Sequence, residues 1–282
     1  MKNIIQITKA EVLNRYRPID KFTHKGIQGH VLIIGGSYGK MGSICLAGKA
    51  ALRTGCGLVT ALVPQCGYEI VQSSVPEMMV LTSGTNYLED LTYKLVPQAV
   101  AIGPGMGQEL LTADALRSYL TQNQQNLVVD ADALNIISSY PDLLSTLPPQ
   151  TVLTPHLGEL ARLIGDWKDE KDKLQKVQDF SKKYNLIVVV KGVPTFIVHD
   201  HVLYENPSGN AALATAGSGD VLTGIITSLI AQGYPPLDAA ITGVYLHGHT
   251  ADLALPETGY HSFIASDIIA NLGRAWLSLT SL

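Results

Sequence analysis

The sequence predicts an α/β fold in which a mostly parallel central sheet carries helices on both faces. Two features of its 282 residues lead to this prediction. Unbroken apolar runs such as His30–Ile34 and Leu186–Val190 are typical of strands that are buried on both faces. These runs alternate with helical patterns at least five times, which indicates successive parallel strand–helix units. No internal repeat or low-complexity linker interrupts the pattern, so we expect one domain over residues 1–282, with 1–22 as an N-terminal extension.

Composition excludes several classes of protein. Hydrophobic residues make up 46% of the chain and charged residues 16%, which predicts a sizeable core rather than disorder. The net charge is −4 without a basic run, so neither nucleic acid nor a membrane is an expected partner. Cys45, Cys56 and Cys66 form no CxxC pair and fit a reducing compartment better than a disulfide framework. Without a signal peptide or an apolar run of about 18 residues, the protein is expected to be soluble and cytoplasmic.

The elements follow in order from the spacing of apolar residues and from the Gly, Pro or polar residues that end each run. Strands are expected at His30–Ile34, Leu58–Val63, Val75–Leu81, Ala99–Ile102, Leu127–Asp130, Thr151–Thr154 and Leu186–Val190, and Phe196–Val198 pairs with Val202–Tyr204 as a hairpin. Helices are expected at Thr8–Arg15, Ser43–Leu52, Glu109–Leu120, Ala131–Ile137, Leu160–Ile164, Glu170–Tyr184, Leu237–Leu255 and Ile264–Trp276, with another after Asp220.

Five unusual segments come directly after a predicted strand. They are Gly35–Gly42, Gly103–Gly107, Asp130–Asn135, Thr154–Glu159 and Lys191–Thr195. Because ligands bind outside the carboxyl ends of the strands in parallel sheets, we expect these segments to converge on one site. The first segment lacks the GxxxxGK[ST] spacing of a P-loop, and taken alone it is more typical of a tight turn between strand and helix.

The stretch Thr215–Asp220 leads into an apolar helix and is the most informative part of the chain. Gly217 and Gly219 permit a tight turn, and the start of the helix offers free N–H groups to an anion. A carboxylate at Asp220 would repel a bound phosphate, but it suits a loop that also deprotonates an attacking hydroxyl. The alternative is purely structural, with Ser218 or Asp220 acting as the N-cap of the helix.

Other polar residues also have a functional and a structural interpretation. Lys191 could neutralise a phosphate or be an ordinary lysine at a strand end. His156 could bind a ligand oxygen or cap a helix, and Glu159 could reach Mg²⁺ through water or only complement the helix dipole. Asp130, Asp132 and Asn135 could contact a ligand, and Asp132 or Asn135 could equally be a cap or a local turn residue. His247 and His249 do not form a transition-metal motif, since they lie two residues apart on a predicted helix.

Taken together, these segments are similar to the ribokinase-like superfamily, and more closely they resemble the ADP/ATP-dependent NAD(P)H-hydrate dehydratases, the family of the YjeF C-terminal domain. The resemblance runs in order from residue 24 through HKGIQGHVLIIGGSYGKMG, IGPGMG, VVDADALN, TPHLGELARL, VVVKGVPTFI, NPSGNAALATAGSGDVLTGIITSLIAQG and GVYLHGHTADLA. Related vitamin-precursor kinases usually have asparagine at the position of His156. The chain departs from the family at Ala211–Leu213 and at Ala216, where Pro-Gly-Met and glycine are more usual.

The resemblance implies a lyase that dehydrates the S epimer of NADH or NADPH hydrate, with ADP or ATP as co-substrate and Mg²⁺ as cofactor. The ring hydroxyl is phosphorylated and then lost as phosphate, with release of AMP when ADP is used. Asp220 is implied as the base. The remaining roles implied are substrate binding by Ser43, Gly105, His156 and Asp220, nucleotide binding by Lys191, Gly192, Val193, Pro194, Thr195 and Gly219, an anion hole of Gly217, Ser218 and Gly219, and Mg²⁺ held through water by Glu159.

Stand-alone relatives imply a homotetramer that works beside a separate NAD(P)H-hydrate epimerase, because the residues before the match are too few for the epimerase domain fused in many relatives. Two alternatives remain at this stage. The first is a kinase of a small alcohol, such as a vitamin precursor, on the same fold. The second is a non-catalytic nucleotide-binding protein, against which Asp220 argues.

Overall fold

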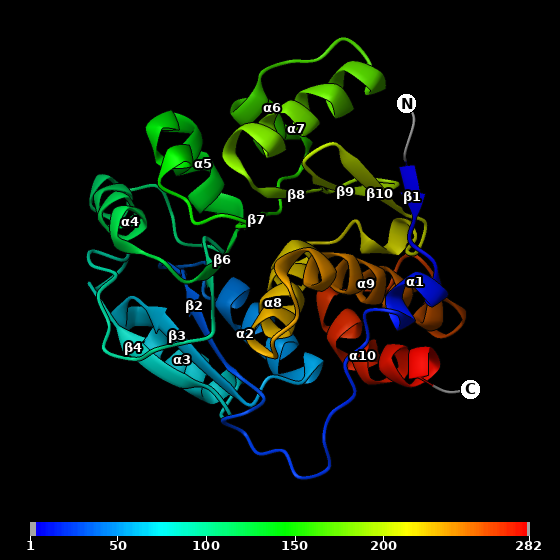
Figure 1. Cartoon of the computed structure of the whole chain (residues 1–282). Helices are drawn as coiled ribbons and strands as arrows, with labels where there is room; N and C mark the ends of the chain where they lie inside the picture. Colours follow the sequence, from blue (N-terminus) through cyan, green and yellow to red (C-terminus); the bar gives the residue numbers. More distant parts are fainter. Residues whose placement is uncertain (1–3, 281–282) are drawn as a thin grey trace.

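The computed structural model describes residues 4–280, so the two ends of the predicted domain, 1–3 and 281–282, lie outside the described residues. One ten-stranded sheet runs through the molecule in the order β1-β10-β9-β8-β7-β6-β5-β2-β3-β4 (Figure 1). The strands are β1 (Ile4–Gln6), β2 (His30–Ile34), β3 (Leu58–Val63), β4 (Met79–Thr82), β5 (Ala99–Ile102), β6 (Asn126–Val129), β7 (Val152–Leu153), β8 (Ile187–Val190), β9 (Thr195–His199) and β10 (Val202–Asn206).

The helices flank this sheet. They are α1 (Lys9–Leu13), α2 (Gly42–Thr54), α3 (Tyr68–Ser74), α4 (Leu110–Gln122), α5 (Ala131–Ser139), α6 (Leu157–Ile164), α7 (Glu170–Tyr184), α8 (Ser218–Ala231), α9 (Pro236–Thr258) and α10 (Ala265–Thr280), with short 3₁₀ turns at Gln65–Gly67, Pro141–Ser145 and Ala211–Leu213. None of the helices described between residues 4 and 280 is long and apolar enough to cross a membrane.

The sheet is mostly parallel, as predicted. Of the paired strands, β9 runs antiparallel to both β8 and β10, and the other neighbours pair in parallel. The chain builds β2, β3 and β4 toward one edge and then returns, so that β5 lies on the other side of β2. The loops after β2 and β5 therefore flank the point where the strand order reverses, which is where α/β sheets bind ligands.

Alternate residues of each strand point to opposite faces and build two cores. Val31 and Ile33 of β2 belong to the core under α2, α8, α9 and α10, whereas Leu32 and Ile34 belong to the core under α4, α5, α6 and α7. Both sets are fully buried. The predicted layers, with helices on both faces of a buried sheet, are confirmed (Figure 1).

Some predicted elements differ in the structure. The expected strand Val75–Leu81 is the shorter β4, because Tyr68–Ser74 form α3 and Val75 is the residue that ends this helix. The helix expected from Leu160 begins at Leu157, since His156 caps it. The short strand β1 was not predicted; Ile4–Gln6 pair in parallel with Leu203–Glu205 and extend the sheet.

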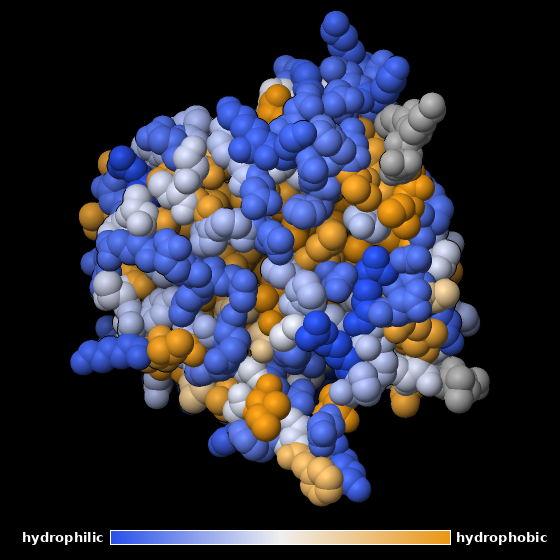
Figure 2. Space-filling model, in the orientation of Figure 1, coloured by the Kyte–Doolittle hydropathy of each residue, from blue (hydrophilic) through white to orange (hydrophobic). Residues whose placement is uncertain are grey.

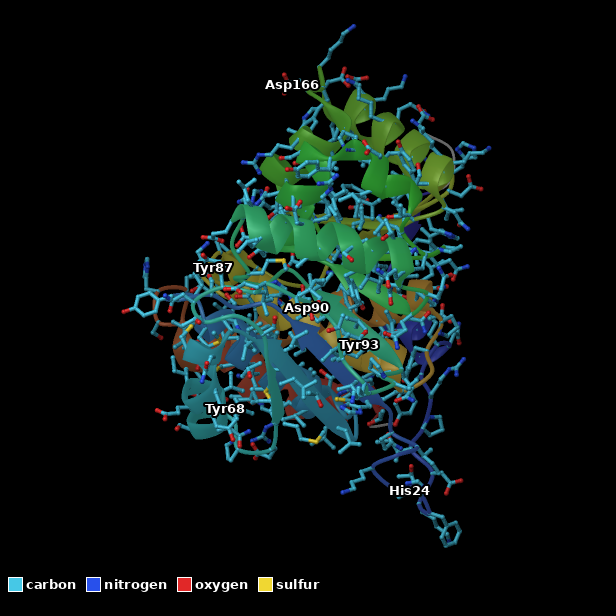
Figure 3. All side chains as sticks on the ribbon, turned by 90° about the vertical axis from the view of Figure 1, so that its left-hand side faces the viewer. His24, Tyr68, Tyr87, Asp90, Tyr93 and Asp166 are labelled. Carbon is cyan, nitrogen blue, oxygen red and sulfur yellow. The ribbon has the colours of Figure 1, made fainter. Side chains whose placement is uncertain are left out.

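The two ends of the molecule have different surfaces: the N-terminal segment exposes apolar side chains, and the end that carries α7 is polar. The segment between α1 and β2 projects from the body and exposes Ile19, Phe22 and Ile27, and its His24 lies at the opposite end from Asp166 (Figure 3). Over α6 and α7 the surface is mainly hydrophilic (Figure 2). This agrees with the amphipathic sequence of α7, which buries Leu174, Val177 and Phe180 and exposes most of its charged residues.

Helix α8 packs very closely against α2 in the core beneath the sheet. A Cβ added at Gly224 would lie 2.1 Å from the carbonyl oxygen of Ala47, so the two helix backbones touch at this glycine. Because a backbone atom cannot move aside as a side chain can, the contact requires glycine on α8. The position of α8, whose first turn faces the carboxyl ends of the strands, depends on this contact.

We expect Gly224→Ala to lower the free energy of unfolding by about 2 kcal/mol, since the added methyl group must push α8 away from α2. Gly273→Ala is the matched control, because Gly273 is an exposed helical glycine of α10 with open space around its Cβ position. That change should stabilise the protein by about 0.5–1 kcal/mol. Urea unfolding of both variants measures the difference, and equal stability of the two would contradict the close contact.

Candidate active site

The loops after β2 and β5 are joined to each other at the carboxyl edge of the sheet. Gly36 N–H donates to the carbonyl of Pro104 at 2.9 Å, and the Ser37 hydroxyl donates to the carbonyl of Gly105 at 2.8 Å. Gly105 has a φ of +61°, and a Cβ there would lie 3.3 Å from that of Ser43. The predicted convergence of these two loops is therefore confirmed, and it places Gly105 beside Ser43 at the start of α2.

The first turn of α8 faces this edge without a capping side chain. Gly217 is the N-cap residue in the left-handed region, with φ of +85°, and among the described residues no side chain caps this helix start. The structural interpretation of Ser218 or Asp220 as the N-cap was therefore wrong, because the helix already begins at Ser218. The Ser218 amide makes a long bond of 3.3 Å to the carbonyl of Thr215. The other amides of this first turn and the positive end of the helix dipole are left available to an anion.

A cavity of about 800 Å³ lies in front of this turn. Its walls come from the ends of β6 and β8, from the starts of α6 and α8, and from the loop after β10. Most of the predicted site residues line it: His156, Glu159, Lys191, Gly192, Val193, Pro194, Thr195, Gly217, Ser218, Gly219 and Asp220. This volume is in the range of small-molecule and cofactor sites.

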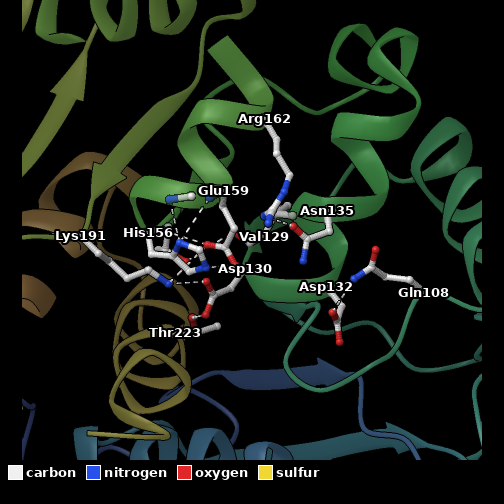
Figure 4. A network of polar contacts seen from close by, with 12 residues as sticks. Gln108, Val129, Asp130, Asp132, Asn135, His156, Glu159, Arg162, Lys191 and Thr223 are labelled. Carbon is white, nitrogen blue, oxygen red and sulfur yellow. Dashed lines mark hydrogen bonds and ion pairs between the residues drawn. The ribbon is translucent and has the colours of Figure 1, made fainter. Parts of the chain in front are cut away.

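Lys191 occupies the middle of a cluster of carboxylates. Its Nζ lies 2.8 Å from Asp130 Oδ1 and 3.9 Å from Glu159 Oε2 (Figure 4). Burial alone would lower the pKa of Lys191, but the negative charges of Asp130, Glu159 and Asp220 outweigh it and raise that pKa, so the ammonium stays charged. A Cβ on Gly219 would lie 3.3 Å from Lys191 Nζ, which places this charge directly at the start of α8.

Asp130 is a buried counter-ion for this lysine and is 1% exposed. Its second oxygen accepts a hydrogen bond from the Thr223 hydroxyl at 2.8 Å. With both oxygens occupied by partners from β8 and α8, Asp130 ties three elements together. The structure thus gives Asp130 a structural role, and the interaction with Thr223 was missed in the sequence because a threonine inside an apolar helix pattern gives no signal.

Asp220 is a titratable group of the candidate site with a pKa well above its ordinary value. Burial, followed by the negative charge of Asp130, raises its pKa to about 6, against the opposing influence of the Ser43 hydroxyl and Lys191. Ser43 therefore lies beside Asp220, although it is outside the main cavity wall. A carboxylate with this pKa can be deprotonated at neutral pH and still accept a proton readily, as a general base requires.

His156 is the N-cap of α6. Its Nδ1 accepts hydrogen bonds from the amides of Gly158 and Glu159 at 3.0 and 3.3 Å, and the Glu159 carboxylate accepts from the His156 amide at 2.8 Å. Because Nδ1 is an acceptor, Nε2 carries the hydrogen, and it lies 3.3 Å from Glu159 Oε1. The His156 side chain is 57% exposed, so its ring still reaches the cavity while it caps the helix.

Glu159 is buried by the same capping interaction. It is 5% exposed, and burial raises its pKa while the charge of Lys191 opposes this change. The described residues contain no group of three or more His, Cys, Asp or Glu side chains placed to hold a metal ion. With its oxygens already facing His156 and Lys191, Glu159 suits contact with a hydrated Mg²⁺ through water better than direct coordination.

Asp132 and Asn135 lie on α5, outside the cavity wall. Asp132 accepts hydrogen bonds from the Gly107 amide at 2.9 Å and from Gln108 at 3.1 Å, and Lys40 is 3.4 Å away. Asn135 accepts from Arg162 of α6 at 2.8 Å. Both residues therefore have structural contacts, but these join segments distant in the sequence and are not the local cap or turn that was the expected alternative.

His247 of α9 is a further cavity residue, and its role was missed in the sequence, where only metal binding was considered. Its Nε2 lies 3.0 Å from the carbonyl oxygen of Ser218. Asp252, one turn further along α9, accepts from the Gly209 amide at 2.8 Å and from Asn210 at 2.9 Å. Helix α9 thus holds both the first turn of α8 and the loop after β10.

Comparison with known proteins gives a consistent result. Residues 31–274 match the family model described as NAD(P)H-hydrate dehydratase. The chain is 40% identical to a bifunctional NAD(P)H-hydrate repair enzyme of Moorella thermoacetica over 87% of this chain and 49% of that protein, so it spans about half the length of this relative. It is 37% identical to an ADP-dependent (S)-NAD(P)H-hydrate dehydratase of Neisseria meningitidis, over 90% of this chain and 86% of that one.

A solved structure agrees with these relatives. The ADP/ATP-dependent NAD(P)H-hydrate dehydratase of Bacillus subtilis, co-crystallised with ATP and Mg²⁺, superimposes with a TM-score of 0.84 over 99% of this chain and 100% of that chain, at 27% identity. The shared architecture confirms the ribokinase-like α/β fold expected from the sequence. From the family match over most of its length and from these relatives, this chain belongs to the NAD(P)H-hydrate dehydratase family.

Proposed function

We propose that this protein is an ADP-dependent dehydratase that converts the S epimer of NADH or NADPH hydrate back to NADH or NADPH, with release of AMP and phosphate. The observation that carries this proposal is the position of Asp220, a carboxylate with a pKa of about 6 at the uncapped start of α8. It shares the cavity wall with the cation of Lys191. A base, a cation and free amides at one place are what transfer of a phosphoryl group to a hydroxyl needs.

The reaction proceeds in two steps because hydroxide is a poor leaving group and phosphate a good one. Asp220 takes the proton of the ring hydroxyl, whose oxygen attacks the β-phosphorus of ADP while the bond to AMP breaks. The phosphorylated ring then expels phosphate as electrons from the ring nitrogen form the new double bond, and loss of a ring proton restores the reduced nicotinamide. The amides of Gly217, Ser218 and Gly219 stabilise the negative charge that develops during transfer.

The two substrates contact different sets of residues around Asp220. Lys191–Thr195 and Gly219 line the cavity and bind the nucleotide, with Lys191 neutralising its phosphates. Ser43 lies beside Asp220 and Gly105 beside Ser43, and these two residues bind the hydrated nicotinamide ring with His156. The transferred phosphoryl group is thereby held in front of the first turn of α8.

When Mg²⁺ is bound, it supplies charge neutralisation on the phosphates of the nucleotide. Glu159 would hold it through water, since Mg²⁺ in such sites keeps several waters and uses few carboxylates. The buried Glu159 carboxylate, already bonded to the His156 amide, fits this indirect contact.

The family also supports further proposals about the protein in the cell. We expect a cytoplasmic homotetramer that acts together with an NAD(P)H-hydrate epimerase activity, which supplies the S epimer. Cys45, Cys56 and Cys66 are all free thiols, as a reducing compartment favours.

Asp220→Asn should lower kcat by about 10²-fold or more, because the amide cannot take the proton of the hydroxyl. The measurement is recovery of the near-ultraviolet absorbance of the reduced nicotinamide from NADH hydrate with ADP and Mg²⁺. Asp114→Asn, at an exposed aspartate of α4, is the control and should keep full activity. Unchanged activity of the Asp220 variant would remove the base assignment. Phosphorylation of a small alcohol, without recovery of NADH by the unmodified protein, would favour a vitamin-precursor kinase instead.

The pH dependence follows from the raised pKa of Asp220, which is about 6. A base acts in its deprotonated form, so kcat/KM should be constant at neutral pH and fall as the pH decreases through this value. One proton is taken up, so the decrease should approach about tenfold per pH unit. Initial rates across this range test it, and a rate that stays constant well below this pH would contradict the assignment.

His156→Asn separates the two roles of this residue. Asparagine is a good N-cap, so the free energy of unfolding should change by less than about 0.5 kcal/mol. The ring that reaches the cavity is lost, so KM for NADH hydrate should rise about tenfold, as expected for one lost hydrogen bond. An unchanged KM in a stable variant would mean that His156 only caps α6.

A further inference from the structure

His247 is a buried histidine to which the reaction described above assigns no role. It lies on α9 and is 9% exposed. Its Nε2 contacts one residue twice, with the carbonyl oxygen of Ser218 at 3.0 Å and the hydroxyl of Ser218 at 3.1 Å. Ser218 is the first residue of α8 and directly precedes Gly219 and Asp220.

The contact defines the chemical state of the ring. A carbonyl oxygen only accepts hydrogen bonds, so Nε2 of His247 carries the hydrogen and donates it to Ser218. Burial lowers the pKa of His247 to about 4, the nearby charge of Lys191 acts in the same direction, and the bond to Ser218 opposes both. The ring is therefore neutral at the pH where Asp220 is a base, and it adds no positive charge to the site.

The first turn of α8 needs support from outside the helix. Its N-cap is Gly217 in the left-handed region, and within residues 4–280 no side chain caps it. The amide of Ser218 reaches the carbonyl of Thr215 at a long 3.3 Å. A glycine-rich turn of this kind is intrinsically mobile, so a donor on a neighbouring helix that bonds Ser218 restricts where the following amides point.

We propose that His247 is a positioning residue that holds the first turn of α8 in the orientation required for phosphoryl transfer. The inference rests on the proposed function, since it assumes that the amides of Gly217–Gly219 stabilise the transferring group. A change of about 1 Å in such donors is enough to reduce catalysis strongly. The residue acts through Ser218 and does not itself touch the reacting atoms.

The rest of α9 supports this assignment. On the next residue, a Cβ at Gly248 would lie 2.5 Å from the carbonyl of Ser208, so the helix and the loop after β10 are in direct contact. Asp252 then bonds Gly209 and Asn210 of the same loop. Helix α9 thus contacts two walls of the cavity, the loop after β10 and the first turn of α8. His247 makes the contact with the first turn of α8, which carries Asp220.

Three variants test the proposal. His247→Leu removes the donor, whereas His247→Gln places an amide N–H near the position of Nε2. His249→Leu is the matched control, because His249 lies on the same helix and bonds the Ser278 hydroxyl of α10 at 2.8 Å, away from the cavity. Thermal unfolding of all three shows whether the losses of stability are comparable. Activity with NADH hydrate and ADP, and ADP binding by calorimetry, are then measured on each.

We expect His247→Leu to lower kcat about tenfold or more with little change in KM for the hydrate, because a hydrogen bond used in positioning is lost. His247→Gln should keep most of the activity, and His249→Leu should keep all of it. Full activity of His247→Leu, or an equal loss of activity in the His249 variant, would overturn the proposal.

If the unmodified protein binds ADP without dehydrating the hydrate, the proposed function fails. In that case the role of His247 is tested by calorimetry alone. A positioning role predicts weaker ADP binding in His247→Leu and unchanged ADP binding in His249→Leu.

Discussion

The buried ion pair between Lys191 and Asp130 is the interaction on which the candidate site depends. It joins the end of β8 to the end of β6, and the bond from Thr223 to Asp130 adds α8 to the same point. An unpaired charge at a position that is 1% exposed would cost several kcal/mol, so the pair must form whenever the core forms. Folding therefore places a cation at the start of α8 before any ligand is present.

The same cluster explains why Asp220 differs from an ordinary aspartate. Lys191 is surrounded by Asp130, Glu159 and Asp220, so a single positive charge must offset the negative charges of three carboxylates. All three line the cavity, but Asp130 is also bonded to the Thr223 hydroxyl and Glu159 to the His156 amide, which hold the scaffold. Asp220 has a pKa raised to about 6. The fold thus divides similar side chains into structural groups and one that is suited to proton transfer.

Close backbone contacts hold this arrangement rigidly. Gly224 lets α8 touch α2, and Gly248 lets α9 touch the loop after β10. Between them, His247 connects α9 to the first turn of α8. The glycine-rich turn that offers its amides to an anion is itself flexible, so contacts from neighbouring elements are needed to fix the orientation of these amides. The turn can therefore approach a phosphate closely, while contacts from neighbouring helices restrict its motion.

Local sequence patterns were sufficient to predict the parallel sheet, its flanking helices and the convergence of five loops, because apolar periodicity and strand ends depend only on nearby residues. Motif order added the family and most of the candidate residues, from Ser43 to Asp220. Contacts between distant segments settle the questions that local patterns leave open. The tertiary structure made His156 a helix cap, excluded Asp220 as a cap, and gave Asp130, Thr223 and His247 their partners. Those partners lie on other elements of the fold, and the energy of a buried polar group depends on what folding places next to it.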